Sequence, residues 1–221
     1  MTARDNILAR IRAAQRKPAG AEAAEREAVR SHLAARAAGP RPGIGGDPLA
    51  SFRARALALA STVASVSSMQ EVPAEVGEYL RGSALPCKAV CWPQLAALDW
   101  AGGRVTVEAR AARDGDLVGI TGAFCAIAET GTLALVSGPQ TPASVSLLPE
   151  THIAVLHADR IVPDMEAAWR LLREESPALP RAVNFVSGPS RTADIEQTVT
   201  LGAHGPYRVH IIVISDSQTV P

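Results

Sequence analysis

The sequence predicts an α/β domain built on a largely parallel sheet with helices on both faces, preceded by a helical arm. Apolar residues make up 47% of the 221-residue chain, whereas aromatic residues make up only 4%. From Leu49 onward, short apolar segments alternate with helical patterns. Near-continuous apolar strands separated by helices are typical of parallel sheets that are covered on both faces. We therefore expect a core of Ala, Val, Leu and Ile side chains between such layers.

The arm is predicted from a change in composition near Leu49. Residues 2–17 predict a short amphipathic helix whose apolar stripe consists of Ile7, Leu8 and Ile11. Residues 21–38 contain mostly Ala, Glu and Arg, which favour a helix but leave little to bury, so we expect it to be exposed or docked on a partner. A Gly- and Pro-rich stretch follows and predicts a linker. We expect an arm and linker over residues 1–48 and an α/β domain over residues 49–221.

Apolar spacing predicts the helices of the α/β domain, and β-branched runs predict its strands. The first helix is expected to pack through Leu49, Phe52, Leu57 and Leu59. Residues 104–108 alternate between polar and apolar, which is typical of a half-buried strand. In chain order the predicted elements are helix 49–60, strand 62–66, helix 73–81, strand 87–91, a helical turn over 93–98, strands 104–108, 117–121, 132–136 and 152–156, helix 164–174, and strands 182–186 and 209–214.

The charges are balanced overall but unevenly distributed. Residues 1–55 contain eleven Lys and Arg against five Asp and Glu, and the remainder contains eleven against seventeen. A basic arm could dock on an acidic partner or on its own acidic body. An acidic, aromatic-poor body argues against a nucleic-acid partner. No apolar run reaches the roughly 18 residues that span a bilayer, and the N-terminal segment has no signal-peptide core. We expect a cytoplasmic protein with no membrane partner.

The three cysteines, Cys87, Cys91 and Cys125, indicate structural thiols. A structural zinc ion takes four Cys or His ligands and an iron–sulfur cluster normally takes four cysteines. In a strand, Cys87 and Cys91 would lie about 13 Å apart, too far to share one ion. The sequence also has no H-E-x-x-H or C-x-x-C pattern. We therefore predict no metal site and no cofactor on this chain.

Two segments rich in Gly, Ser and Thr are the best candidates for a ligand site. In the first, Glu129 precedes Thr130, Gly131 and Thr132 within an otherwise apolar stretch. A buried carboxylate is costly unless it is hydrogen-bonded or functional. Glu129 is thus either a structural residue that joins two loops or a general base or nucleophile.

The second segment runs from Ser187 to Glu196 and is predicted to be a turn from a strand into a helix. Ser190 or Thr192 could cap that helix, and Asp194 and Glu196 would suit its positive end. Arg191 could bind a carboxylate or phosphate with its fork of N–H groups. The alternative is a well-capped structural turn with an internal Arg–Asp pair. The ligand-binding candidates are Thr130, Gly131, Thr132, Ser187, Gly188, Ser190, Arg191, Thr192, Asp194, Glu196 and Gly205.

His204 is the most suggestive of the five histidines. It lies in Gly202-Ala203-His204-Gly205-Pro206, and flanking glycines would keep it accessible for proton transfer. His152 and His210 lie in predicted strands and are expected to be core histidines with satisfied rings. The candidate catalytic residues are therefore Glu129 and His204.

With these motifs the chain resembles the LUD-domain family, and within it the lactate-utilisation C group. The resemblance rests on residues 127–133, on Ser146-Leu147-Leu148-Pro149 with His152-Ile153, on residues 187–196 and on residues 202–206. It implies a fold similar to that of the sugar-phosphate isomerase and CoA-transferase superfamily.

The resemblance also implies a function in the oxidation of L-lactate to pyruvate. It implies a small carboxylate ligand and partner proteins that carry the iron–sulfur clusters, since this group lacks cysteine-rich cluster motifs. Whether this chain is itself an enzyme is left open. The alternatives are a stand-alone enzyme of the same fold, such as a CoA transferase with Glu129 as nucleophile, and a non-catalytic assembly module that docks through its arm.

Overall fold

The structure is a computed structural model that describes residues 2–16, 22–37, 39–41, 43, 45–176, 178–195 and 198–215. For residues 193–195, 198 and 199 the description covers the backbone alone. The chain forms two compact units, Met1–Arg41 and Pro42–Pro221.

The first unit contains α1 (Ala3–Ala14) and α2 (Glu22–Ala35). A capping box begins α1: the Thr2 hydroxyl accepts from the Asp5 amide, and the Asp5 carboxylate accepts from the Thr2 amide. These hydrogen bonds lower the pKa of Asp5. No residue of either helix is buried. The two helices form as predicted, but neither has a core of its own.

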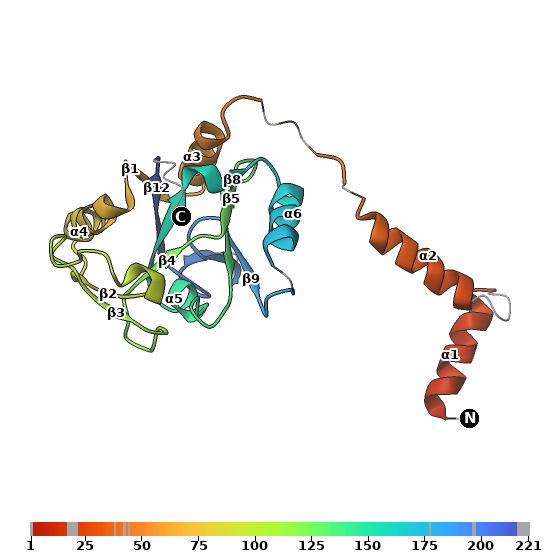
Figure 1. Cartoon of the computed structure of the whole chain (residues 1–221). Coiled ribbons are helices and arrows are strands. Elements are labelled where there is room, and N and C mark those ends of the chain that lie inside the picture. Colours follow the sequence, from red (N-terminus) through yellow and green to blue (C-terminus); the bar gives the residue numbers. More distant parts are fainter. Residues whose placement is uncertain are drawn as a thin grey trace. The chain divides into compact units, whose positions relative to one another are not determined.

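A six-stranded sheet, parallel throughout, forms the centre of the second unit (Figure 1). Its strands in spatial order are β1 (Thr62–Val66), β12 (Arg208–Ile214), β7 (Thr151–His157), β4 (Val118–Gly122), β2 (Lys88–Cys91) and β3 (Thr106–Ala109). The central strands β12 and β7 are the longest and are almost entirely buried. Their apolar side chains alternate between two cores, one on each face of the sheet.

Helices cover both faces of this sheet. On one face α4 (Val72–Gly82) buries Val72, Val76 and Leu80. On the other, α3 (Pro48–Ala58) buries Phe52 and Ala56, and the short α5 (Ser144–Leu147) packs against β4 and β7. The predicted α/β architecture with a largely parallel sheet is confirmed. Single turns of 3₁₀-helix complete the connections: η1 (Met69–Glu71), η2 (Pro93–Leu95) and η3 (Ala158–Arg160).

A second, four-stranded sheet shares the α3 side of the parallel sheet. Its strands in spatial order are β8 (Ile161–Val162), β5 (Cys125–Ile127), β6 (Thr132–Val136) and β9 (Val183–Val186). The β5–β6 and β6–β9 pairs are antiparallel. Its outer face packs on α6 (Met165–Glu175), which lies on the opposite side of the unit from α4 (Figure 1). The sequence predicts β6 and β9 as strands but does not separate them from the main sheet, because both sheets use the same apolar residues.

Two local predictions are wrong. Leu57 is 51% exposed, because the buried face of α3 is formed by Phe52 and Ala56. The segment after Ser187 does not enter a helix: β10 (Arg191–Ile195) pairs antiparallel with β11 (Thr198–Leu201). β-branched residues in this segment, such as Thr192 and Ile195, favour extended backbone over the expected helical turn.

The two strand histidines are core residues, but the prediction of satisfied rings holds for one nitrogen of each. His152 Nε2 lies 2.8 Å from Thr121 Oγ1, and His210 Nδ1 lies 2.8 Å from Thr62 Oγ1. The other nitrogen of each ring has no hydrogen-bond partner in the described part of the chain. Burial lowers the pKa of both rings to about 4, so both are neutral at pH 7.

Candidate functional site

Three hydroxyl groups join the two Gly/Ser/Thr segments. Glu129, Thr130 and Gly131 form the turn between β5 and β6. The Thr130 and Thr132 hydroxyl oxygens lie 2.7 Å apart, and the Thr132 oxygen lies 2.8 Å from that of Ser187, 55 residues away in the chain. Thr132 is buried at the centre, whereas Thr130 and Ser187 are exposed at the two ends. This hydrogen-bonded row of three hydroxyl groups is called the hydroxyl chain below. Because each hydroxyl can both donate and accept, its exposed ends can offer a ligand either a hydrogen-bond donor or an acceptor.

Two glycines hold these segments against the last turns of α3. Gly131 has φ +67°, and a Cβ there would lie 2.6 Å from the Ala56 amide nitrogen. Gly188 has φ +79°, and a Cβ there would lie 2.3 Å from the Leu59 carbonyl oxygen. Both positions therefore require glycine for conformation and for space. Sequence reasoning finds the glycines but misses α3, which carries no motif and is identified only by these contacts.

Arg191 is an exposed cation beside these turns. Its Nη2 donates to the Leu59 carbonyl over 3.4 Å, and Gly188 lies against that same carbonyl oxygen. A guanidinium has five N–H donors, and among the described residues Arg191 uses one of them, in this long hydrogen bond. The predicted Arg–Asp pair is not tested, because the Asp194 side chain lies outside the description, and so does Glu196. Thr192, which was predicted as a possible cap, is buried in β10 instead.

Ser190 connects Arg191 to the loop that contains His204. The Ser190 amide donates to the Pro206 carbonyl over 2.9 Å, and the His204 amide donates to the Ser190 hydroxyl over 3.4 Å. A Cβ at Gly205 would lie 3.5 Å from the Ser190 Cβ, an ordinary van der Waals distance, so the loop packs against Ser190 without requiring glycine at this position. The His204 side chain is exposed, as the flanking glycines suggest.

Glu129 does not occupy the buried position expected from its apolar neighbours. It is half-buried because it lies within the hairpin turn between β5 and β6, outside the sheet. Its amide donates to the Pro163 carbonyl over 3.0 Å. Among the described residues, no hydrogen bond or ion pair joins Glu129 to His204. The structure therefore brings the hydroxyl groups of the two segments together, but it does not pair the two candidate catalytic residues.

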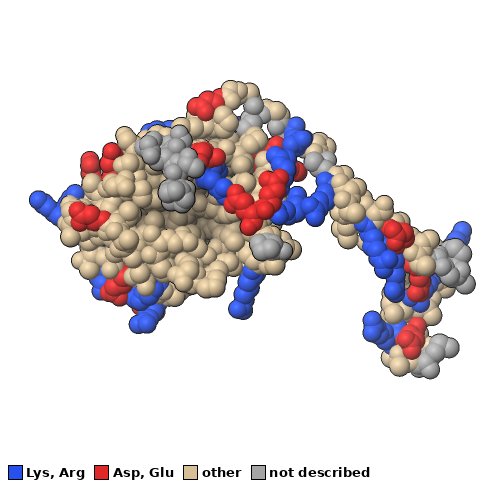
Figure 2. Space-filling view, viewed as in Figure 1, with Lys and Arg blue, Asp and Glu red and all other residues tan. Residues whose placement is uncertain are grey.

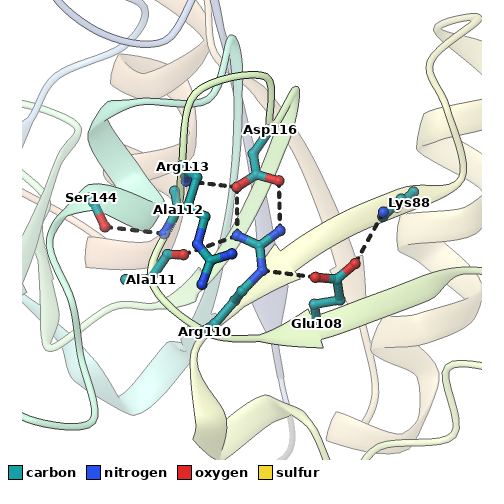
Figure 3. A network of polar contacts seen from close by, with 8 residues as sticks. All are labelled: Lys88, Glu108, Arg110, Ala111, Ala112, Arg113, Asp116 and Ser144. Carbon is teal, nitrogen blue, oxygen red and sulfur yellow. Dashed lines mark hydrogen bonds and ion pairs between the residues drawn. The ribbon is translucent and has the colours of Figure 1, made fainter.

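The strongest cluster of charges lies elsewhere, around Arg110 (Figure 3). Its guanidinium donates to both carboxylate oxygens of Asp116, over 2.7 and 2.9 Å, and to Glu108 over 2.7 Å. Lys88 binds the other Glu108 oxygen over 3.0 Å. These hydrogen bonds raise the pKa of the Arg110 guanidinium. The bond from Arg110 also lowers the pKa of the Asp116 carboxyl to about 2. No local sequence pattern marks this network, whose members lie on β2, on β3 and in the loop between β3 and β4.

The cysteines do not fit an iron–sulfur cluster. Cys87 and Cys91 pack in the core beneath α4, whereas Cys125 packs beneath α6. Burial raises the pKa of Cys91 and Cys125 to about 11, which disfavours the thiolate that binds metal. Within the described ranges, no three His, Cys, Asp or Glu side chains gather as metal ligands. In the same part of the chain, no helix is both long enough and apolar enough to cross a membrane.

The sequence model of the LUD domain matches residues 95–214, more than half of the chain. The chain belongs to the LUD domain family. The match includes the β5–β6 turn, Arg191 and the loop with His204. The resemblance seen in the sequence is thereby confirmed.

Several relatives share the name lactate utilization protein C. Lactate utilization protein C 1 of Bacillus mycoides is 41% identical over 120 residues, which cover 53% of this chain and 51% of that protein. The protein of Halalkalibacterium halodurans is 43% identical over 102 residues, which cover 45% of this chain and 44% of that protein. The Bacillus subtilis protein is 40% identical over 102 residues, which cover 45% of this chain and 42% of that protein. The matches thus span about half the length of these LUD relatives.

A solved structure shares the fold. The crystal structure of a DUF162 family protein from Deinococcus radiodurans superposes with a TM-score of 0.54 at 25% sequence identity. The match covers 79% of this chain and all of that one. The α/β fold described above is therefore one that occurs in a solved relative.

Proposed function

We propose that this LUD protein is a component of a lactate-utilisation system and binds a small carboxylate, L-lactate or pyruvate. The binding groups form the Arg191 site, defined as Thr130, Thr132, Ser187, Ser190 and Arg191. The observation that carries the proposal is the exposed Arg191 guanidinium, which makes one long hydrogen bond among the described residues and lies beside a row of three hydroxyl groups. The names of the relatives support the choice of ligand.

The chemistry of the site matches a 2-hydroxy or 2-oxo acid. Arg191 would take the carboxylate in a bidentate, charge-assisted contact. The exposed ends of the hydroxyl chain, at Thr130 and Ser187, would bind the neighbouring oxygen, since a hydroxyl can donate to the ketone of pyruvate or accept from the alcohol of lactate. Glu129 and His204 are the carboxylate and imidazole available for proton transfer nearby.

Partner proteins would complete the reaction. Oxidation of lactate to pyruvate releases two electrons and two protons, and the cysteines of this chain do not fit a cluster that could accept those electrons. We propose that iron–sulfur lactate-utilisation proteins accept them. The task of this chain is then to hold the carboxylate while a partner oxidises it.

A thermal-shift screen tests ligand binding. Purified protein is heated with L-lactate, D-lactate, pyruvate, inorganic phosphate or acetyl-CoA. A ligand present at about 100 times its dissociation constant should add about 2.7 kcal/mol of stability. We expect a shift with lactate or pyruvate that Arg191→Ala abolishes and that Arg113→Ala, which removes another exposed arginine, retains. A shift with acetyl-CoA alone would contradict the proposal and favour the CoA-transferase alternative.

Reconstitution tests the partners separately. The chain is mixed with iron–sulfur lactate-utilisation proteins, and lactate-dependent dye reduction is measured. We expect oxidation to require this chain and to fall at least tenfold with Arg191→Ala. Full activity without this chain would show that it has no part in the reaction.

A further inference from the structure

The first unit carries an apolar stripe that nothing in its own two helices covers. Ile7, Leu8 and Ile11 of α1 and Val29 and Leu33 of α2 are between 38% and 68% exposed. The residues of each helix lie three or four positions apart, so they share one face. Leu8, Ile11 and Val29 line a groove of about 570 Å³ between α1 and α2. This set of five residues is called the arm stripe below.

These two helices are too short to be stable without a partner surface. Isolated helices of fewer than about 12–15 residues are marginal in water, and α1 and α2 contain 12 and 14 residues. The capping box of α1 and an ion pair of 2.6 Å between Arg12 and Glu22 support the hairpin. That ion pair is more than half exposed, and such pairs contribute little. The stability of the arm must therefore come from burial of the arm stripe.

The charges beside the groove favour a second copy of the same surface over an acidic partner. Arg12 is paired with Glu22, and Arg30 is paired with Glu27 over 3.3 Å. Figure 2 shows basic and acidic groups interspersed along this unit, not gathered by sign. A two-fold interface brings each residue opposite its own equivalents or its neighbours, so it requires a surface that complements itself. A mixed-sign rim around an apolar stripe meets that requirement, whereas an acidic surface would face Glu22 and Glu25 as well as the three arginines that line the groove.

We propose that α1 and α2 pair with the same helices of a second copy of this chain to form a four-helix bundle. The arm stripes of the two copies bury one another in its core, as apolar positions do in such bundles. The arm is thus a dimerisation element. This inference is independent of the ligand assigned to the Arg191 site.

The first test is the mass of the full chain in solution, measured by sedimentation or light scattering over a range of concentrations. We expect twice the chain mass of 23.1 kDa. The variant Ile11→Asp with Val29→Asp places charges in the stripe and should weaken association at least tenfold. Its matched control is Ala9→Asp with Ala24→Asp, which adds the same charges on the opposite helix faces and should remain dimeric. A monomeric wild-type chain at all accessible concentrations, or a stripe variant that still dimerises, would overturn the proposal.

A second test distinguishes direct contact from simple unfolding of the arm. Val29→Cys is made in a Cys87→Ser background, since Cys91 and Cys125 are buried. Under mild oxidation, two copies with different tags should cross-link through this position. Ala24→Cys in the same background should not cross-link. Equal cross-linking at both positions would show that the arm stripe is not the interface.

Discussion

Two arginines of the same domain differ in almost every contact that they make. Arg110 is three-quarters buried and uses its guanidinium on two carboxylates and the Ala111 carbonyl (Figure 3). Arg191 is exposed and, among the described residues, makes one long hydrogen bond, to a carbonyl at the end of α3. The first arginine has its charge neutralised within the fold. The charge of Arg191 is not neutralised by any described carboxylate. The contacts of an arginine, and not its charge alone, therefore distinguish a structural arginine from a binding one.

The surroundings of the two arginines differ in the same way. Around Arg110 the polar groups satisfy one another: Asp116 also accepts from the Arg113 amide, and Glu108 also binds Lys88. Among the described polar groups near Arg191 are hydroxyls in a row that ends at the exposed Thr130 and Ser187. A closed network stabilises a loop, whereas an open one can accept a ligand.

The largest predicted effect compares one glycine from each region. Gly188 and Gly115 both have positive φ, +79° and +85°, but a Cβ at Gly188 would meet the Leu59 carbonyl, while a Cβ at Gly115 would meet nothing within 4 Å. We expect Gly188→Ala to lower the free energy of unfolding by about 2–4 kcal/mol and Gly115→Ala by about 1 kcal/mol. Urea unfolding measures both. Equal losses would show that the turn at Gly188 is not held against α3.

The next effect is on the Arg110 network. Asp116→Asn removes the charge that binds Arg110 in a bidentate contact, and we expect it to lower the free energy of unfolding by about 1–2 kcal/mol. Arg191→Ala should change this free energy by less than about 0.5 kcal/mol, because exposed side chains contribute little to stability. The same urea experiment compares them. A larger loss for Arg191→Ala would mean that this arginine is structural after all.

A pH series sharpens the comparison further. The Arg110 contact lowers the pKa of Asp116 from 3.8 to about 2. A depressed carboxyl pKa contributes stability that is present above about pH 4 and is lost as the pH falls toward 2. We expect wild-type and Arg191→Ala proteins to lose about 1 kcal/mol more than Asp116→Asn over this range. If the stability of all three proteins fell in parallel with pH, the lowered pKa could not be assigned to the contact between Asp116 and Arg110.

A small effect on stability is also predicted at the hydroxyl chain. Ser187→Ala removes one exposed end of the chain, so the free energy of unfolding should fall by no more than about 1 kcal/mol. Lactate affinity should nevertheless fall several-fold, since the ligand loses a hydroxyl partner. Ser137→Ala, which removes the hydroxyl that accepts from the Ala182 amide, is the control that should leave affinity unchanged. A similar loss of affinity in both variants would indicate a general loosening of the second sheet.

The central strands of the parallel sheet could be predicted because their residues are largely apolar. The runs at 152–156 and 209–214 lie within β7 and β12, as buried parallel strands require. The end of the Ser187 segment could not be predicted correctly, because a Gly-Pro turn followed by Ser, Thr and Asp has the signs of a helix start. The β-branched residues that form β10 and β11 instead are a weaker local signal.

The composition of the site could be predicted more fully than its geometry. Thr132 and Ser187 were both candidates, but their contact depends on the antiparallel pairing of β6 with β9, which no local pattern specifies. The floor of the site, the end of α3, carries no motif at all. The burial expected for Glu129 was wrong because the preceding strand, β5, ends at Ile127, and Glu129 lies in the turn that follows.

The most direct test of the account is a calorimetric titration of L-lactate and pyruvate into three proteins: wild type, Arg191→Ala and Arg113→Ala. The account predicts that wild type and Arg113→Ala bind one of these ligands with the same affinity, and that Arg191→Ala binds it at least tenfold more weakly while unfolding at the same temperature. Unchanged binding in Arg191→Ala would contradict the claim that Arg191 holds the carboxylate of the ligand.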